Sequence, residues 1–168
     1  MYSHRHSESA GYIKMIYLYT DGSSRGNPGP GGYGAILRYN QHEKELAQGY
    51  RRTTNNRMEL LAVIRGLEAV TNPTLPVTVV TDSRYVVDAV TKKWVDGWLR
   101  KPDFGGKANE DLWRRIVPLL KLRRVEFNWI RGHNGHAENE RCDVLAVASA
   151  MGELGPLLVD EAYEKLQK

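Results

Sequence analysis

The sequence predicts an α/β fold, a mixed five-stranded sheet with helices packed on both faces. Two observations predict it. Three stretches with alternating or β-branched apolar residues follow one another in the first third of the chain, which is typical of antiparallel strands in hairpin succession. After them, strand-like and helix-like stretches alternate, which is typical of parallel strands joined by helices.

The first half of the fold follows from breakers and apolar runs. The Gly-Pro-rich residues 26–32 predict a turn between the first two strands. A helix that ends before the Asn72-Pro73 pair follows the third strand. We therefore expect strands at residues 13–20, 33–39 and 44–52, and a helix over residues 56–70.

The second half alternates between strands and helices. Residues 77–81 form an apolar run that predicts a buried strand, and Ser83 is placed to cap the helix that follows it, through about Lys92. The remaining expected elements are a helix at residues 109–122, a strand at residues 125–130 and a helix at residues 138–150.

Length and composition point to one domain. At 168 residues the chain is long enough to bury a sizeable core, and 41% hydrophobic with 26% charged residues is ordinary for a globular protein. We expect a flexible segment at residues 1–12, the domain at residues 13–150, and a loosely attached tail at residues 151–168, where Gly155-Pro156 interrupts an acidic stretch.

Charge and cysteine usage limit the possible environment. The single Cys142 cannot form an internal disulfide, and no run approaches 18 apolar residues. The sequence therefore predicts a soluble, cytoplasmic protein without a membrane partner, and we expect a monomer. The net charge of +4 is compatible with a polyanionic partner.

Two predicted core strands lead into aspartate. Asp21 follows the apolar run in "IYLYTDGSS", and Asp82 follows the run in "VTVVTDSRY". Taken alone, Asp21 could form a turn before glycine and Asp82 could cap a helix. Because both residues are expected at the carboxyl ends of neighbouring strands, they could also share one site.

Helical spacing directs two more carboxylates inward. Glu59 shares its helix face with Ala62, Val63, Gly66 and Val70, and we expect that face on the sheet. The opposite, polar face is expected to hold Arg57, Arg65 and Glu68. Asp143 lies in the same way on a stripe of small apolar residues, which comprises Ala146, Val147 and Ala150.

Four carboxylates in one place need neutralising cations. Taken alone, Glu59 could interact favourably with the dipole of its helix, and Asp143 could be a solvated surface residue. Four carboxylates close together, however, repel one another and raise one another's pKa values. Oxygen ligands suit Mg²⁺ or Mn²⁺, and two such ions about 4 Å apart perform displacement at phosphorus.

The chain resembles type 1 ribonuclease H from about Met15 to Ala150. The matching blocks are "YTDGSSRGNPGPGGYGA", "TTNNRMELLAVIRGLE", "TDSRYV", "NEDLW" and "WIRGHNGHAENERCD". The resemblance implies the ribonuclease H-like fold and Mg²⁺-dependent hydrolysis of the RNA strand of an RNA–DNA hybrid. The products would carry 5′-phosphate and 3′-hydroxyl ends.

The resemblance also implies roles for individual residues. Asp21 and Asp143 would hold the ion that activates water, and Asp21, Glu59 and Asp82 the ion that stabilises the leaving 3′-oxygen. Mn²⁺ is the expected substitute for Mg²⁺. His133, on a loop between Gly132 and Gly135, would assist proton transfer or product release.

The family's substrate contacts map to two groups of residues. Asn27, Asn55 and Asn56 would read the 2′-hydroxyl, and Thr54 would help to hold a DNA phosphate, although turn and cap chemistry is the simpler interpretation of these stretches. The stretch from Lys92 to Lys107 corresponds to the basic protrusion, or handle, of bacterial members. Its expected contacts are Lys92, Lys93, Trp94, Trp98, Arg100 and Lys101, and a solvated charged face is the alternative.

Other functions fit the sequence less well. His133, His136 and Cys142 could form part of a zinc site, but no fourth ligand is suitably spaced. "DGSS" also resembles the phosphate loop of actin-like ATPases, which need two large domains. Integrases and junction resolvases lack the "TNNRMEL" and "GHNGHAENE" blocks. A non-catalytic nucleic-acid-binding module would gain nothing from clustered acids that face a polyanion.

Overall fold

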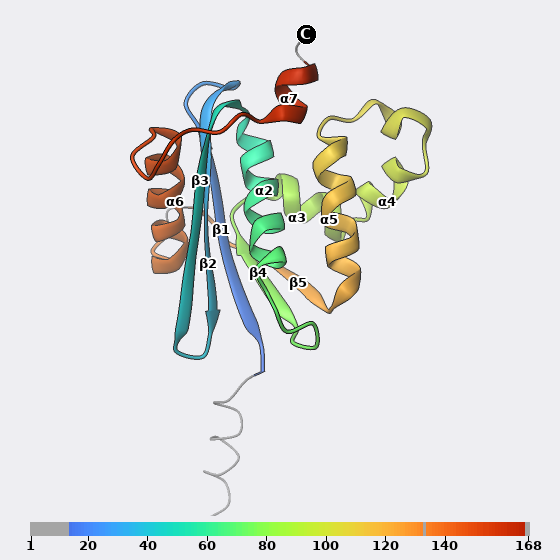
Figure 1. Cartoon of the computed structure of the whole chain (residues 1–168). Helices are drawn as coiled ribbons and strands as arrows, with labels where there is room; N and C mark the ends of the chain where they lie inside the picture. Colours follow the sequence, from blue (N-terminus) through green and yellow to red (C-terminus); the bar gives the residue numbers. More distant parts are fainter. Residues whose placement is uncertain (1–13, 133, 167–168) are drawn as a thin grey trace, which may run out of the picture.

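A computed structural model of the chain describes residues 14–132 and 134–166, and its centre is a twisted five-stranded sheet (Figure 1). The strand order is β3-β2-β1-β4-β5. β1, β2 and β3 pair antiparallel, whereas β4 and β5 extend the sheet parallel to β1. The predicted mixed sheet is therefore confirmed. Its strands are β1 (Ile16–Ser24), β2 (Gly29–Tyr39), β3 (His42–Thr53), β4 (Val77–Thr81) and β5 (Val125–Trp129).

Helices cover both faces of this sheet, as predicted. In Figure 1, α6 lies on one side of the β1–β3 strands, and α2 lies on the other side with α3 and α5 beyond it. Among the described residues, no helix has the length and apolar character that a membrane crossing requires. The helices are α2 (Asn55–Glu68), α3 (Arg84–Thr91), α4 (Trp94–Leu99), the 3₁₀ turn η1 (Pro102–Gly106), α5 (Glu110–Leu122), α6 (Ala137–Ala150) and α7 (Glu161–Leu166).

The first strand is longer than the sequence suggests. β1 continues past Thr20 to Ser24, because Asp21 still pairs with Gly34 of β2. Its parallel pairing with β4 ends earlier, at Tyr19 and Val80. Asp21 therefore does not end the strand but lies where β1 has passed its pairing with β4 and is still paired with β2. β4, in contrast, ends directly before Asp82, as expected.

Glycines in β2 let α6 approach the sheet closely. A Cβ atom on Gly34 would lie 2.3 Å from the carbonyl oxygen of Cys142, and one on Gly32 would lie 2.7 Å from that of Ala146. Separations this short exclude any side chain at these positions. The glycines thus set the depth at which α6 packs, and with it the position of Asp143.

Arg57 is buried in the structure, and its expected place on the polar face of its helix is wrong. Only 2% of the residue is exposed. Its guanidinium donates to Asp160 (Nε to Oδ2, 2.7 Å) and to Asp111 (Nη2 to Oδ2, 2.7 Å). Thr53 also donates to Asp160 from its hydroxyl, at 2.6 Å. Two carboxylates from distant parts of the chain therefore compensate the buried charge.

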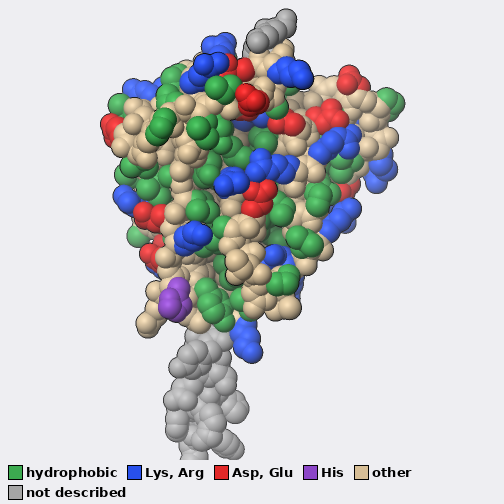
Figure 2. Space-filling view, in the orientation of Figure 1, with side chains coloured by type: hydrophobic (Ala, Val, Ile, Leu, Met, Phe, Trp, Pro, Cys, Tyr) green, Lys and Arg blue, Asp and Glu red, His purple; other side chains and the backbone are tan. Residues whose placement is uncertain are grey.

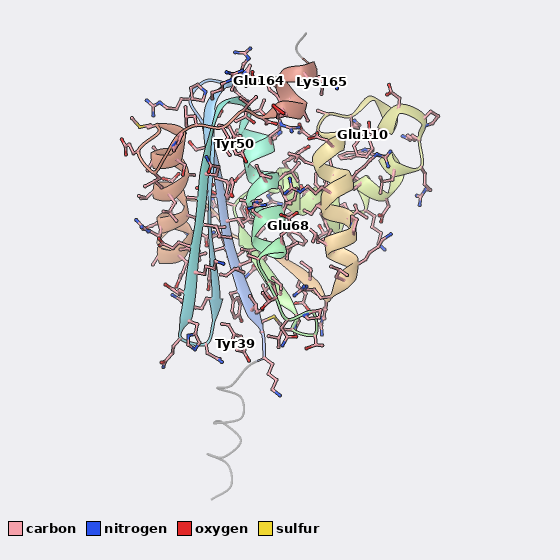
Figure 3. All side chains as sticks on the ribbon, viewed as in Figure 1. Tyr39, Tyr50, Glu68, Glu110, Glu164 and Lys165 are labelled. Atoms are coloured by element: carbon pink, nitrogen blue, oxygen red, sulfur yellow. The ribbon has the colours of Figure 1, made fainter. Side chains whose placement is uncertain are left out.

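The C-terminal tail is docked, which corrects the expectation of a loose appendage. The Leu158 amide donates to the Gly49 carbonyl at 3.0 Å, and the Arg51 amide donates to the Leu158 carbonyl at 2.8 Å. Glu164 on α7 accepts two hydrogen bonds from Arg51, both of 2.9 Å. Figure 3 labels Glu164 beside α7, at the end of the sheet above Tyr50 of β3.

Candidate metal centre and nucleic-acid interface

Three carboxylates from three elements meet beside the sheet. Asp21 comes from β1, Glu59 from α2, and Asp82 from the residue after β4. One oxygen of each lies within 4.8 Å of the others. The parallel arrangement of β1 and β4 explains the meeting of the two aspartates, because each lies two residues beyond the point where the pairing of these strands ends.

Glycines let the chain pack closely around these carboxylates. A Cβ atom on Gly22 would lie 2.5 Å from the Glu59 amide nitrogen, so glycine is needed for α2 to press Glu59 against the end of β1. On the other side, a Cβ atom on Gly132 would lie 2.4 Å from Oδ2 of Asp82. A side chain at position 132 would therefore cover that carboxylate.

Asp143 joins the group from α6. It lines a small cavity of about 10 Å³ together with Asp21 and Asp82. Its charge and its hydrogen bond with Asp21 both favour the protonated form of Asp21. The four residues that helical and strand geometry selected are therefore neighbours in the structure. Asp21, Glu59, Asp82 and Asp143 are called the carboxylate cluster below.

The electrostatics of the cluster favour bound protons or cations. Burial, followed by the charges of Asp82 and Asp143, raises the pKa of Asp21 from 3.8 to about 8. Burial, followed by the charges of Asp21 and Asp82, raises the pKa of Glu59 well above its ordinary value. Repulsion of this kind is relieved when a cation binds between the oxygens.

The donor set fits a hard divalent cation. Oε1 of Glu59 is buried and has no hydrogen-bond partner among the described residues. A buried carboxylate oxygen without a partner is costly unless a ligand satisfies it. All four side chains offer oxygen, which suits Mg²⁺ or Mn²⁺ and not structural zinc. The residues present therefore fit the metal that the sequence suggests.

Two loops that were expected to contact the substrate are joined in the structure. Oδ1 of Asn27 accepts a hydrogen bond from the Asn55 amide at 3.0 Å. Thr54 caps α2, because its hydroxyl accepts from the Arg57 amide at 3.2 Å. Asn56, which follows Asn55, is exposed. The cap interpretation of Thr54 is therefore confirmed, and Asn27 and Asn55 form one unit.

The handle, residues Lys92–Lys107, comprises α4 and η1 and projects beyond α5 (Figure 1). Trp94 is 46% exposed, with the Lys92 ammonium 5.4 Å from its ring centre. Trp98 instead packs edge-on against Phe104 and Trp113, at 5.7 and 6.1 Å between ring centres. Trp94 is therefore available to a ligand, while Trp98 holds the handle to α5.

The cations of the handle lie at the surface. Lys92, Lys93, Arg100 and Lys101 are all exposed. Figure 2 shows basic side chains, with acidic ones among them, over the part of the molecule where Figure 1 places α4 and α5. A charged ligand can reach these groups without any rearrangement of the fold.

Arg84 begins α3, two residues after Asp82. Its guanidinium carbon lies 4.0 Å from the ring centre of Trp129. Nε1 of Trp129 in turn donates to the Asp82 carbonyl at 3.0 Å. The stacked ring holds this exposed cation close to the carboxylate cluster.

His133, the histidine expected to assist catalysis, lies outside the described residues. Sequence reasoning did not select Asn139, whose side-chain amide on α6 donates to the Val80 carbonyl at 2.9 Å. The available signal was its spacing, since a residue four positions before Asp143 shares that residue's helix face.

Comparison with known proteins identifies the family. The chain matches the RNase H family over residues 14–151. A ribonuclease H of Nitratidesulfovibrio vulgaris is 56% identical over 139 residues, covering 80% of this chain and 88% of its own. A ribonuclease H of Proteus mirabilis is 49% identical over 159 residues, covering 92% and 97%.

A solved structure agrees with this result. LC9-RNase H1, described as a type 1 RNase H with the type 2 active-site motif, is 35% identical and superposes with a TM-score of 0.74. The match covers 90% of this chain and 80% of that one. The family match over most of the chain, the similar sequences and the shared fold agree, and the chain belongs to the RNase H family of enzymes.

Proposed function

We propose that the protein is an endonuclease that hydrolyses the RNA strand of RNA–DNA hybrids at the carboxylate cluster. The observation that carries the proposal is the convergence of three carboxylate oxygens within 4.8 Å, one of them from a buried side chain, in a member of the RNase H family. The RNase H family cleaves the RNA strand of such hybrids. The products would have 5′-phosphate and 3′-hydroxyl ends.

The cluster has residues for two Mg²⁺ or Mn²⁺ ions. Asp21 and Asp143 would hold one ion, and Asp21, Glu59 and Asp82 would hold the other. When bound, the metal would supply an activated water and neutralise charge on the leaving oxygen. A side chain at position 132 would collide with Oδ2 of Asp82, so glycine there would keep room for the scissile phosphate.

The remaining residues would bind and orient the hybrid. Asn27, Asn55 and Asn56 offer amide groups to the 2′-hydroxyls, which distinguish RNA from DNA. Thr54 would help to hold the DNA strand, and His133 would assist proton transfer or product release. Trp94 offers an open ring to the DNA sugars, while Trp98 acts through the shape of the handle.

The direct test uses a hybrid labelled in its RNA strand. We expect internal cleavage with Mg²⁺, none in chelator, and none of duplex DNA or single-stranded RNA at matched concentrations. Analysis of the fragment ends shows which product carries the phosphate. Equal cleavage of single-stranded RNA and hybrid would contradict the specificity, and binding of hybrid without any cleavage would indicate the non-catalytic module.

The handle should contribute to affinity and not to chemistry. Replacement of its four exposed cations by alanine removes phosphate contacts, and each lost contact reduces the dependence of log KM on log salt by about one unit. We expect KM to rise several-fold with kcat little changed. The variant replaces Lys92, Lys93, Arg100 and Lys101, and steady-state kinetics at several salt concentrations measure the effect.

A matched control variant removes four positive charges far from the handle, at the edge of the sheet where β1, β3 and β5 begin. The four cations that it replaces are exposed, and they lie near the starts of these strands or at the end of α5. We expect KM and the salt slope to stay near those of the unmodified protein. Equal changes of KM and salt slope in both variants would show that the handle is only a solvated charged face and not a binding surface for the hybrid. The control replaces Lys14, Lys44, Lys121 and Arg124.

A further inference from the structure

Asn139 ties α6 to the two strands that carry Asp21 and Asp82. Its Nδ2 group donates to the Val80 carbonyl at 2.9 Å and lies 3.5 Å from the Thr20 carbonyl oxygen. Thr20 directly precedes Asp21, and Val80 lies two residues before Asp82. One amide group therefore contacts β1 and β4 at the point where their pairing ends.

The orientation of this amide follows from its partners. Both contacts are carbonyl oxygens, which only accept, so the NH₂ group must face them and Oδ1 must face away. Asp143 lies one helical turn after Asn139 and shares its face of α6. The Asn139 side chain thus links α6, which carries Asp143, to the backbone of the strands that precede Asp21 and Asp82.

The other end of the amide offers a second, independent observation. Oδ1 of Asn139 is buried and has no hydrogen-bond partner among the described residues. Asn139 lines the small cavity of about 10 Å³ beside Asp21, Asp82 and Asp143. That volume is close to the minimum for one water molecule, and a water held by a cation could donate to this oxygen.

We propose that Asn139 is a positioning residue for the metal centre. Its NH₂ group fixes the separation of the strands that bear Asp21 and Asp82, and its Oδ1 accepts from a water of the bound cation. The inference rests on the proposed metal-dependent function. Asn139 itself would touch neither the hybrid nor the reacting phosphate.

The test is the Asn139→Ala variant, measured by metal binding as well as by activity. Loss of such a supporting hydrogen bond typically weakens metal affinity 10–100-fold. We expect the Mg²⁺ concentration that gives half of the metal-induced rise in Tm to increase at least about 10-fold. Isothermal titration with Mg²⁺, at a temperature where melts in chelator show the variant folded, should give the same ratio. At saturating Mg²⁺, KM for the hybrid should be unchanged.

Asn128→Ala is the matched control, because Asn128 is an exposed asparagine on β5. Its Mg²⁺ midpoint should equal that of the unmodified protein. A lower Tm in chelator with an unchanged Mg²⁺ midpoint for Asn139→Ala would show a merely structural contact and overturn the inference alone. If Mg²⁺ does not raise the Tm of the unmodified protein, the proposed metal centre and the inference both fail.

Discussion

Asp21→Asn should abolish hydrolysis and yet stabilise the metal-free protein. Asp21 lies among the carboxylates that raise its pKa, so the folded state carries a repulsion that the unfolded chain largely escapes. Asparagine keeps the shape and removes the charge. We expect the free energy of unfolding to rise by about 1 kcal/mol or somewhat more, and Tm by about 3 °C.

The pH dependence of this effect follows from the sign of the pKa shift. Asp21 binds its proton more tightly in the folded state, since its pKa is raised from 3.8 to about 8. The unmodified protein in chelator should therefore lose stability as pH rises through that window. The advantage of the variant should be present at neutral pH and shrink toward pH 4.

Thermal melts of both proteins in chelator, at neutral and acidic pH, measure the difference. Added Mg²⁺ should narrow the gap, because it binds the folded unmodified protein and stabilises it by mass action. A lower Tm for Asp21→Asn at neutral pH would mean that Asp21 is a structural cap or a paired ion. The account of the carboxylate cluster would then be wrong.

Arg57→Met should strongly destabilise the fold without touching the metal centre. Burial disfavours the charge of Arg57, but the hydrogen bonds that Arg57 donates to Asp111 and Asp160 outweigh burial and raise the pKa of the guanidinium. Methionine would leave Asp160, which is 8% exposed, without its main partner. We expect the free energy of unfolding to fall by about 3–5 kcal/mol.

Arg51→Met provides the matched control. Arg51 also pairs with a carboxylate of the C-terminal tail, Glu164, but its side chain is 60% exposed. An exposed pair contributes at most about 1 kcal/mol. Denaturant unfolding of the two variants gives the comparison. If both variants lose the same free energy of unfolding, the buried ion pairs of Arg57 stabilise the fold no more than the exposed pair of Arg51.

Much of the sheet could be predicted because its signals are local. The apolar run before Asp82, the Ser83 cap and the helical stripe of Glu59 each depend on residues a few positions apart. The extension of β1 to Ser24 could not be predicted in this way, because it depends on pairing with β2. The burial of Arg57 depends on Asp160, which lies 103 residues away in the sequence, and no local pattern predicts it.

The carboxylates of the candidate site could be predicted for a similar reason. The ends of apolar runs and the helical stripes place Asp21, Glu59, Asp82 and Asp143 without knowledge of distant contacts. Supporting residues are harder to find, since Asn139 acts through backbone carbonyls that any residue could supply. The two tryptophans of the handle look alike in sequence, and only packing against Phe104 and Trp113 separates Trp98 from Trp94.

The 103 residues that separate Asp160 from Arg57 have a consequence for biosynthesis. Because synthesis proceeds from the amino terminus, α2 emerges from the ribosome well before Asp160 does. Until the tail emerges, Arg57 lacks one of its two carboxylates, and the start of α2 lacks its final support. Nascent chains should therefore reach full stability only after Asp160 has emerged, and fragments that end before Asp160 should be preferred substrates for cellular proteases.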